Sequence, residues 1–484
     1  MAERILAETG ATIQAMTFHK LGKNIITKVD HVTPNITNIN MGDFIKEQLN
    51  KLTKDVAYFS RIINFFVYSH DREKSDFDFA SEIEYKEFLE TNPPITLKHE
   101  NVKSYAELDI ANFLFKNDIS YEYEKPYEHD TATLEFGRYF PDFYLPDYGI
   151  YIEHYGIDRN GNVAPYFKGK NGKSASECYN ESIKWKLETH EKHGTKLIES
   201  FYYEKTEGNF LILLKSKLLA EGVILHPVNN ETLWEVITRD NKSILDGLSQ
   251  LIGTIINLIK SNAYEWEYVV RKSHEIVSYA KYKNLLLLEI IHPIYSAYCK
   301  VLIDNHEIDF NDMINQATQY IQCSKYKHPY KYVIVDEYQD MAMSRYRLLK
   351  SMRDQSFFRL FCVGDDWQSI YRFTGSNIGF LLNFIDYWGP TEQSRIETTY
   401  RFSKSLIEIS GAFVMQNPKQ IRKNLVSKNN DNQFALGYIE GYTLRNAVDF
   451  MLQKLDTLPL NSSVFFIGRN NFDIDSIKQC SYFL

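Results

Sequence analysis

Apolar residues recur along the chain with two different periods, and the period changes at only a few places. Over residues 42–70 they stand at helical spacing, which predicts one amphipathic helix. Residues 1–28 are expected to form two helices around TFHKLGKNII, and residues 232–325 return to helical spacing. These three segments predict a largely helical scaffold.

Residues 98–228 follow a different pattern, in which helices alternate with short extended runs. The helix SYAELDIANFLFKN precedes four extended segments, and these lead to a long helix, the strand KLIESFYYE and another helix. The extended segments are SYEYEKPY, ATLEFGRYF, FYLPDYG and IYIEHYG. This order predicts a separate α/β unit inserted between helical regions.

Two continuous apolar runs, YKYVIV and FFRLFCV, are typical of buried parallel strands, and a helical segment separates them. Acids follow both runs, in VDE and GDD, and open parallel sheets bind ligands at the carboxyl ends of their strands. A further α/β segment is expected over residues 394–484, ending in the strand SSVFFIG.

Composition and charge narrow the class of protein. A chain of 484 residues is long enough for roughly two to four domains, and a hydrophobic fraction of 44% argues against disorder. Five cysteines without a CxxC pair suggest neither disulfides nor a zinc site. The most apolar run, NLLLLEIIHPIYSAY, contains Glu289, His292 and Pro293, so no membrane segment is predicted and a cytoplasmic location is expected. Because the net charge is −8, any binding of nucleic acid must come from local groups.

The residues that follow the two apolar runs suggest nucleotide chemistry. Asp336 at a strand end can hold Mg²⁺ on a nucleotide, and the adjacent Glu337 can orient or deprotonate the attacking water. Gln368 can hydrogen-bond a γ-phosphate, and Tyr400 can stack on a nucleobase. Arg401 can neutralise charge on the transferred phosphoryl group. An acidic strand end by itself favours a structural role, so the inference depends on the whole set.

Aromatic residues also follow the second run, in VGDDWQSIYRFTG. Trp367, Tyr371 and Phe373 offer flat surfaces on which the bases of a single strand can stack. This stretch therefore couples a nucleotide site to a base-stacking site.

Six motifs, in their order along the chain, resemble the superfamily 1 DNA helicases of the UvrD/Rep type, and the DNA helicase IV kind most of all. They are TFHKLG (17–22), DFNDMI (309–314), VDEYQD (335–340), VGDDWQSIYRFTG (363–375), TTYRF (398–402) and QNPKQIRK (416–423). The resemblance covers residues 1–30 and 305–475. It implies two RecA-like lobes that use ATP to move along single-stranded DNA, usually from 3′ to 5′.

The resemblance also implies a role for each matched position. Asp336 would be the Mg²⁺ ligand and Glu337 the catalytic base. Gln368 would sense the γ-phosphate, Tyr400 would stack on adenine, and Arg401 would act as an arginine finger. The implied DNA contacts are Thr17, His19, Tyr371 and Phe373, although His19 could equally be a core or capping histidine.

The chain lacks one motif of these helicases, the GxxxxGK[ST] phosphate loop expected before TFHKLG. Its one GKS lies in KGKNGKSAS, where Phe167 occupies the place of the first glycine and no apolar strand precedes it. A basic surface loop is predicted there instead. We therefore expect a fragment, truncated at both ends, of a longer polypeptide. Its ATP hydrolysis should be defective unless the missing remainder of the helicase or a second subunit completes the site.

The inserted unit carries a second set of chemical groups. Asp142 and Glu153 on neighbouring strands can hold Mg²⁺, and Glu107 on a helix can complete the site. A lysine can orient water or stabilise a pentacoordinate phosphate, so the set suits hydrolysis of a phosphodiester. The PD…E spacing within an αβββαβ order resembles the PD-(D/E)xK nucleases.

The position of the lysine departs from that family's pattern. Where the family has Lys two residues after the Glu, this chain has Tyr155. The lysine is therefore expected from the following helix, as Lys186 or, less favoured, Lys184. The alternative is structural: Asp142 and Glu153 would merely end strands, and the two lysines would form a solvated helix face.

The predicted fold class is α/β, with incomplete RecA-like parallel-sheet lobes, a helical subdomain and an inserted restriction-endonuclease-like domain. The expected domains are the first RecA-like lobe without its phosphate loop (1–30), a helical subdomain (31–97), the nuclease-like insertion (98–228), the helical subdomain continued (229–325), the first lobe continued (326–392) and the start of the second lobe (393–484).

The expected function is that of an ATP- and Mg²⁺-dependent DNA helicase or translocase that also carries a Mg²⁺-dependent deoxyribonuclease. Its partner would be DNA that is single-stranded or has a single-stranded tail, in repair or anti-phage defence. Two alternatives remain: a Mg²⁺-dependent endonuclease whose helicase part only binds DNA, and an inactive DNA-binding subunit.

Overall fold

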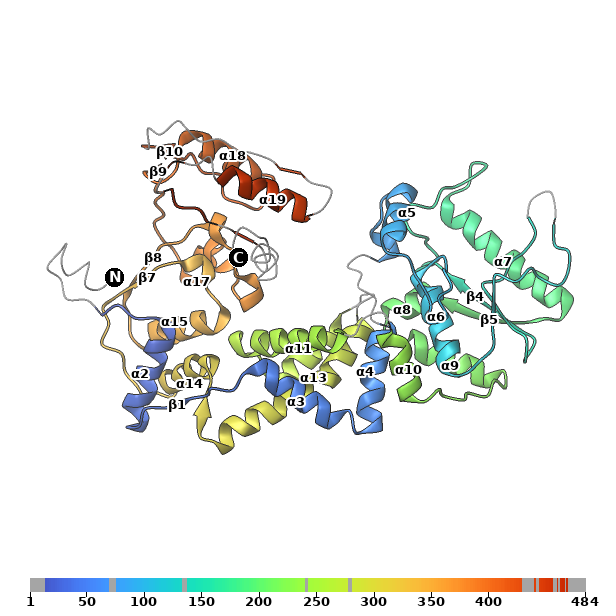
Figure 1. The fold of residues 1–484 in the computed structure, drawn as a ribbon, viewed down its shortest axis with the longest axis horizontal. Coiled ribbons are helices and arrows are strands. Elements are labelled where there is room, and N and C mark those ends of the chain that lie inside the picture. The colour runs from blue at the N-terminus through green and yellow to red at the C-terminus, as the bar shows by residue number, and fades with distance from the viewer. Residues whose placement is uncertain are drawn as a thin grey trace. The chain divides into compact units, whose positions relative to one another are not determined.

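A computed structural model describes residues 14–68, 75–132, 137–239, 243–276, 281–428, 439–440, 444–455, 459, 462–465 and 467–468 (Figure 1). The chain divides into two compact units. The first comprises Met1–Asp365 and Ser369–Leu382, and the second comprises Asp366–Gln368 and Asn383–Leu484. The model has the mixed α/β character predicted from the sequence.

The first unit begins with three helices, α2 (Phe18–Asp30), α3 (Met41–Leu52) and α4 (Val56–Tyr68). The prediction of a single helix over residues 42–70 is wrong, because the chain breaks between α3 and α4. The break follows from local capping: the backbone N–H of Tyr58 donates to Oδ1 of Asp55 at 2.7 Å, which begins a new helix. Residues 1–13, where another helix is expected, lie outside the described residues.

The predicted helical spacing after residue 232 corresponds to real helices. They are α10 (Asn230–Thr238), α11 (Ile244–Ser261), α12 (Trp266–Glu275), α13 (Lys281–Asp304) and α14 (Phe310–Gln322). By length and composition α13 could cross a membrane, yet its buried Ile290 and Ile294 join Ile62 of α4 and Ile252 of α11 in one hydrophobic core. This burial is typical of a core helix.

The segment over residues 98–228 contains the predicted αβββαβ order. Its elements are α6 (Tyr105–Lys116), β2 (Glu122–Tyr123), β3 (Phe143–Leu145), β4 (Ile150–Tyr155), α7 (Ala175–His193) and β5 (Lys196–Phe201), followed by α8 (Tyr202–Thr206) and α9 (Phe210–Ala220). The sheet order is β2-β3-β4-β5, with β4 and β5 parallel and the other pairs antiparallel. The strand expected in ATLEFGRYF is not found at 137–140, and residues 133–136 lie outside the described residues.

Helices cover both faces of this sheet. On one face Ile152 of β4 packs with Ile110 of α6 and Leu214 of α9. On the other face Tyr151 of β4 lies in an aromatic cluster against which Trp185 of α7 packs. Because side chains alternate along a strand, residues 151, 153 and 155 share the face that α7 covers.

The two apolar runs form β7 (Tyr332–Val335) and β8 (Arg359–Cys362), which pair in parallel as predicted, with α15 (Met343–Gln355) between them. The predicted burial of both faces is wrong, because Ile334 and Phe361 are 72% and 60% exposed on a face that the described residues leave open. Helix α14 packs against both α15 and α2, and Gly22 allows its close contact with α2, since a Cβ there would lie 2.6 Å from the carbonyl oxygen of Met313. Short turns follow β7 and β8: η2 (Tyr338–Asp340), η3 (Asp366–Gln368) and η4 (Arg372–Thr374).

The second unit contains β9 (Thr398–Thr399) and β10 (Val426–Ser427), which pair in parallel, and the helices α17 (Phe384–Trp388), α18 (Lys404–Val414) and α19 (Leu444–Leu455). The strand expected in SSVFFIG is not found at residues 462–465 or 467–468. Within this unit Lys423 forms an ion pair with Asp366 at 2.7 Å, so part of the basic QNPKQIRK segment has a structural partner.

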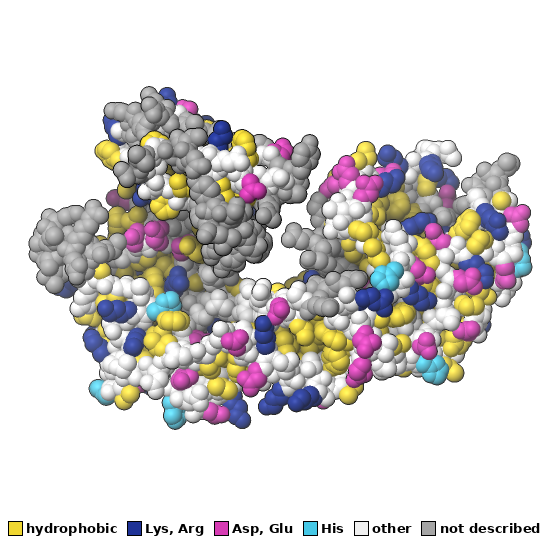
Figure 2. Space-filling view, in the orientation of Figure 1, with side chains coloured by type: hydrophobic (Ala, Val, Ile, Leu, Met, Phe, Trp, Pro, Cys, Tyr) yellow, Lys and Arg dark blue, Asp and Glu magenta, His cyan; other side chains and the backbone are white. Residues whose placement is uncertain are grey.

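Charged side chains are mixed on the face in view. Figure 2 shows Lys and Arg interspersed with Asp and Glu over the part of the chain that carries α7, without a large area of one sign. Binding of a polyanion there must therefore rest on particular groups rather than on a broad field.

Candidate functional site

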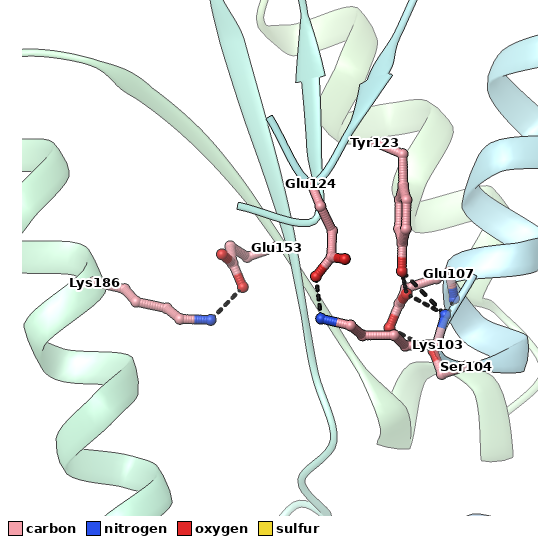
Figure 3. Close-up of polar contacts among 7 residues, drawn as sticks. All are labelled: Lys103, Ser104, Glu107, Tyr123, Glu124, Glu153 and Lys186. Carbon is pink, nitrogen blue, oxygen red and sulfur yellow. Dashed lines mark hydrogen bonds and ion pairs between the residues drawn. The ribbon is translucent and has the colours of Figure 1, made fainter. Parts of the chain in front are cut away.

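The acids and the lysine predicted in the inserted unit meet on the α7 face of its sheet. Glu153 lies in β4 with a fully buried side chain, and Nζ of Lys186, on α7, lies 2.5 Å from its Oε2 (Figure 3). Lys184 is exposed and pairs instead with Glu188 at 3.7 Å. The structure therefore brings Lys186 to Glu153 and leaves Lys184 outside.

Asp142 stands immediately before β3 and is tied to β4. Its Oδ2 accepts the backbone N–H of His154 at 2.7 Å, which holds the carboxylate beside the residue that follows Glu153. Burial and repulsion from Glu153 raise the pKa of Asp142 to about 8, although the charge of Lys186 acts in the opposite direction. Burial likewise raises the pKa of Glu153, and Lys186 partly offsets that rise.

Glu107 lies in the first turn of α6, where its carboxylate is already engaged. It accepts hydrogen bonds from the hydroxyl of Tyr123, from the backbone N–H of Lys103 at 3.0 Å and from the hydroxyl of Ser104 at 2.9 Å (Figure 3). Burial, and then the charge of Asp142, raise the pKa of Glu107 to about 7. Glu107 thus joins Asp142 and Glu153 in what we call the acidic pocket, and it also takes part in the cap of α6.

Asp142 and Glu153 fit a magnesium ion held through two carboxylates and water. Mg²⁺ in proteins usually keeps several waters and takes one or two carboxylate ligands. Oε1 of Glu153 is buried and accepts no hydrogen bond of ordinary geometry, so a lone pair stays available. Among the described residues no three His, Cys, Asp or Glu side chains are spaced as direct ligands of one ion, so a direct bond from Glu107 as well is not indicated.

Asp336 and Glu337 occupy the carboxyl end of β7, and both are exposed. Glu337 has a left-handed backbone conformation, with φ of 53° and ψ of 45°, which costs a non-glycine residue free energy. Its backbone N–H donates to Oδ1 of Asp336 at 3.0 Å. Eight other non-glycine residues of the described chain also have a positive φ, so the conformation alone does not mark this strand end as functional.

Gln339 connects the ends of the two parallel strands. Its Nε2 donates to Oε2 of Glu337 at 2.6 Å, while its Oε1 accepts the backbone N–H of Asp365, after β8, at 3.0 Å. The side chain is buried. Sequence reasoning missed this residue, although its place inside VDEYQD could have singled it out as a neighbour of both acids.

The residues expected to contact DNA have local roles too. The hydroxyl of Thr17 accepts the backbone N–H of Lys20 at 3.2 Å and so caps α2. His19 packs edge-on against Phe310, and burial lowers its pKa, which favours the neutral ring. Tyr371 is 45% exposed. The side chain of Phe373 lies outside the described residues.

The remaining predicted nucleotide contacts belong to the second unit. Gln368 lies in η3, and Tyr400 and Arg401 follow β9 on the surface, with Tyr400 77% exposed. An exposed aromatic ring suits stacking on a base. Their roles beside Asp336 and Glu337 stay predictions.

Comparison with known proteins supports the helicase motifs. The family model for the UvrD/REP helicase N-terminal domain matches residues 1–387. DNA helicase IV of Escherichia coli (strain K12) is 34% identical over 169 residues, which are 35% of this chain and 24% of that protein. The ATP-dependent DNA helicase PcrA of Bacillus subtilis (strain 168) is 29% identical over 175 residues, 35% of this chain and 23% of that protein. The chain thus spans about a quarter of the length of the curated relatives it matches.

The strain at Glu337 can be measured with two substitutions that both remove the carboxylate. Glu337→Gly and Glu337→Ala lose the bond from Gln339 equally, but only glycine adopts the left-handed conformation without steric cost. We expect the glycine variant to be the more stable by roughly 1 kcal/mol, even after the greater freedom of glycine in the unfolded chain. Thermal unfolding of the two variants checks this, and equal or reversed midpoints would contradict it.

The raised pKa values of the acidic pocket predict how stability changes with pH. Between about pH 4 and pH 8 the folded protein keeps protons on Asp142 and Glu107 that the unfolded chain has lost, so stability falls as pH rises through this window. Asp142→Asn should flatten the decline and be the more stable form near pH 8. Mg²⁺ should raise the midpoint of the unmodified protein by a few degrees near pH 8 and that of Asp142→Asn much less.

Thermal melts from pH 5 to pH 8.5, with and without MgCl₂, make this measurement. Asp147→Asn, which removes an exposed carboxylate near the turn between β3 and β4, is the matched control and should behave like the unmodified protein. If stability falls with pH equally in Asp142→Asn and in the unmodified protein, Asp142 does not have a raised pKa. If Mg²⁺ raises both midpoints equally, Asp142 does not hold the ion.

Proposed function

The chain belongs to the UvrD/REP helicase N-terminal domain family, and on that premise we propose that it is part of an ATP-driven DNA helicase or translocase that also cuts DNA with Mg²⁺. Its relatives DNA helicase IV and PcrA are DNA helicases, and PcrA is ATP-dependent by name. The helicase activity of the complete protein, its use of ATP and its polarity from 3′ to 5′ all form part of this proposal.

The observation that carries the nuclease half is the contact between Lys186 and Glu153 in a pocket shared with Asp142. Charged carboxylates are costly in a buried site, and groups with strongly perturbed pKa values are candidates for chemistry. The site lies on one face of the sheet, and the helices and strands of this segment follow the αβββαβ order that the PD-(D/E)xK resemblance implies.

The roles of the nuclease residues follow from these positions. Asp142 and Glu153 would hold the ion, which would supply charge neutralisation and a more acidic water. Nζ of Lys186, held by Glu153, would donate a hydrogen bond to the attacking water or to a phosphate oxygen. Glu107, which accepts a hydrogen bond from Tyr123, would add negative charge that keeps the pKa values of the pocket's acids near neutral pH.

The motor half of the proposal rests on the end of β7. Asp336 would hold Mg²⁺ on the nucleotide, and Glu337 would orient the attacking water, with Gln339 fixing the carboxylate through its 2.6 Å hydrogen bond. Gln368, Tyr400 and Arg401 would contact the γ-phosphate, the adenine and the transferred phosphoryl group. Thr17, His19, Tyr371 and Phe373 would contact the DNA.

A second candidate function is a Mg²⁺-dependent endonuclease whose helicase part only grips DNA. It is favoured by the contact of Lys186 with Glu153, which involves no residue of the helicase motifs. In KGKNGKSAS, Ser174 caps α7 and Lys173 pairs with Glu181, so this GKS serves a helix start rather than a phosphate loop. The two candidates differ in whether nucleotide hydrolysis accompanies DNA binding.

Cleavage of labelled DNA in MgCl₂ without ATP tests the nuclease half. We expect Asp142→Asn, Glu153→Gln and Lys186→Met each to reduce the rate by roughly 100-fold or more, the effect typical of losing a metal ligand or a proton-transfer group. Lys184→Met, two residues away on the same helix, is the matched control and should cleave normally. Undiminished cleavage by Asp142→Asn would locate the activity elsewhere.

DNA-stimulated ATP hydrolysis tests the motor half, in a polypeptide that includes a phosphate loop. Glu337→Gln preserves the size of the side chain but removes the base, so the turnover number should fall by about 100-fold or more while ATP binding persists. Glu47→Gln, on the exposed face of α3, is the control for loss of one acid. Normal turnover in Glu337→Gln would favour the endonuclease whose helicase part only binds DNA.

A further inference from the structure

A cleft of about 580 Å³ opens beside the acidic pocket, and its lining differs from that of the pocket itself. Besides Tyr139 it is lined by Lys103, Glu124, Arg138, Phe140, Trp185 and Lys186. Three of these side chains are cationic and one is acidic, in a chain whose overall charge is −8. The lining of the cleft therefore holds more cationic than acidic side chains, although the chain as a whole is acidic.

Phe140 is the most informative residue of this lining. The chain alternates over residues 138–140, so that Tyr139 is buried while Arg138 and Phe140 are exposed. Phe140 is 46% exposed, and the guanidinium of Arg138 lies 6.0 Å from the centre of its ring. An exposed ring beside a cation is the composition of surfaces that stack nucleic-acid bases.

Each aromatic residue of the cleft is also close in sequence to a member of the acidic pocket. Phe140 precedes Asp142 by two residues, and Trp185 is adjacent to Lys186 on α7. Trp185 packs edge-on against Tyr139 at 5.7 Å, which ties the two segments together. A base held on Phe140 or Trp185 would therefore bring its phosphate near Asp142, Glu153 and Lys186.

The cations of the lining come from separate segments of the chain. Figure 3 shows Lys186 and Lys103 reaching toward the sheet from opposite sides, with Lys103 paired to Glu124. The side chain of Lys103 is 71% exposed, so an arriving phosphate can exchange for the carboxylate of Glu124 at little cost. Because Lys103 and Arg138 both line the cleft, a phosphate backbone that enters it meets cations from two segments of the chain.

We propose that the cleft binds single-stranded DNA, an inference that rests on the proposed nuclease function. Bases stack on Phe140 and Trp185, and phosphates lie against Lys103 and Arg138. The nuclease therefore cuts unpaired strands in preference to duplex. Aromatic platforms take only bases that are free of their neighbours, because a duplex buries both faces of each base. A cleft of about 580 Å³ also suits one or two splayed nucleotides better than a paired helix.

Steady-state cleavage kinetics with the full chain test the preference. For a single-stranded oligonucleotide, Phe140→Ala should raise KM by roughly five- to fifty-fold, the effect of losing one base stack, with kcat changed by no more than about two-fold. Phe140→Trp should restore the original KM. Cleavage of a blunt duplex should be slow and equal in all forms. Ile212→Ala, which removes an exposed apolar side chain from α9 of the same domain, is the matched control.

Photocrosslinking separates this inference from the nuclease proposal itself. Oligothymidylate carrying 5-iodouracil, irradiated with the Asp142→Asn chain in EDTA, should attach to Phe140 or Trp185, as located by peptide mass spectrometry. Crosslinks at Phe140 or Trp185 without any cleavage by the unmodified chain would contradict the nuclease proposal and support single-strand binding in the cleft. Cleavage that depends on Asp142 but is indifferent to Phe140→Ala, with crosslinks confined to the helicase part, would overturn the cleft and leave the nuclease standing.

Discussion

The contact between Lys186 and the buried carboxylate of Glu153 is the constraint on which the α/β segment over residues 98–228 depends. An ionised carboxylate inside a protein is costly unless a partner compensates it, and the neighbouring Asp142 adds repulsion. Lys186 supplies the compensation only because α7 lies across the face of β4 that carries Glu153. The helix must therefore begin and end where it does, with Ser174 capping its start and Gly194 its end in a left-handed conformation.

The same pocket holds acids at positions that apolar side chains could fill. Well-packed hydrophobic side chains often stabilise a core at least as well as a buried ion pair does. A cluster of acids that raise one another's pKa lowers the free energy of unfolding at neutral pH. Such a cost is typical of sites that bind a cation or move a proton. The left-handed backbone of Glu337, at the end of β7, also lowers the free energy of unfolding.

Sequence patterns predicted the elements better than their exact contacts. The order of strands and helices around Asp142 and Glu153 follows from local periodicity, and so does the parallel pair β7 and β8. The break between α3 and α4 was missed because apolar spacing continues across it, yet Asp55 is a local cap signal that could have revealed it. The place of Gln339 inside VDEYQD marks it as a neighbour of two acids, but its contact with the backbone of Asp365, 26 residues away along the chain, needed the structure.

By itself, then, the amino-acid order indicated the family motifs and the mixed α/β class, and it predicted which acids are candidates for a metal ion, because these depend on residue types and short-range spacing. Only the tertiary structure decided between Lys184 and Lys186, since residues two apart on a helix point to nearly opposite sides and the packing of α7 selects one of them. It alone also placed Phe140 and Lys103 at one opening, because the sheet and α6 bring together segments that lie far apart along the chain.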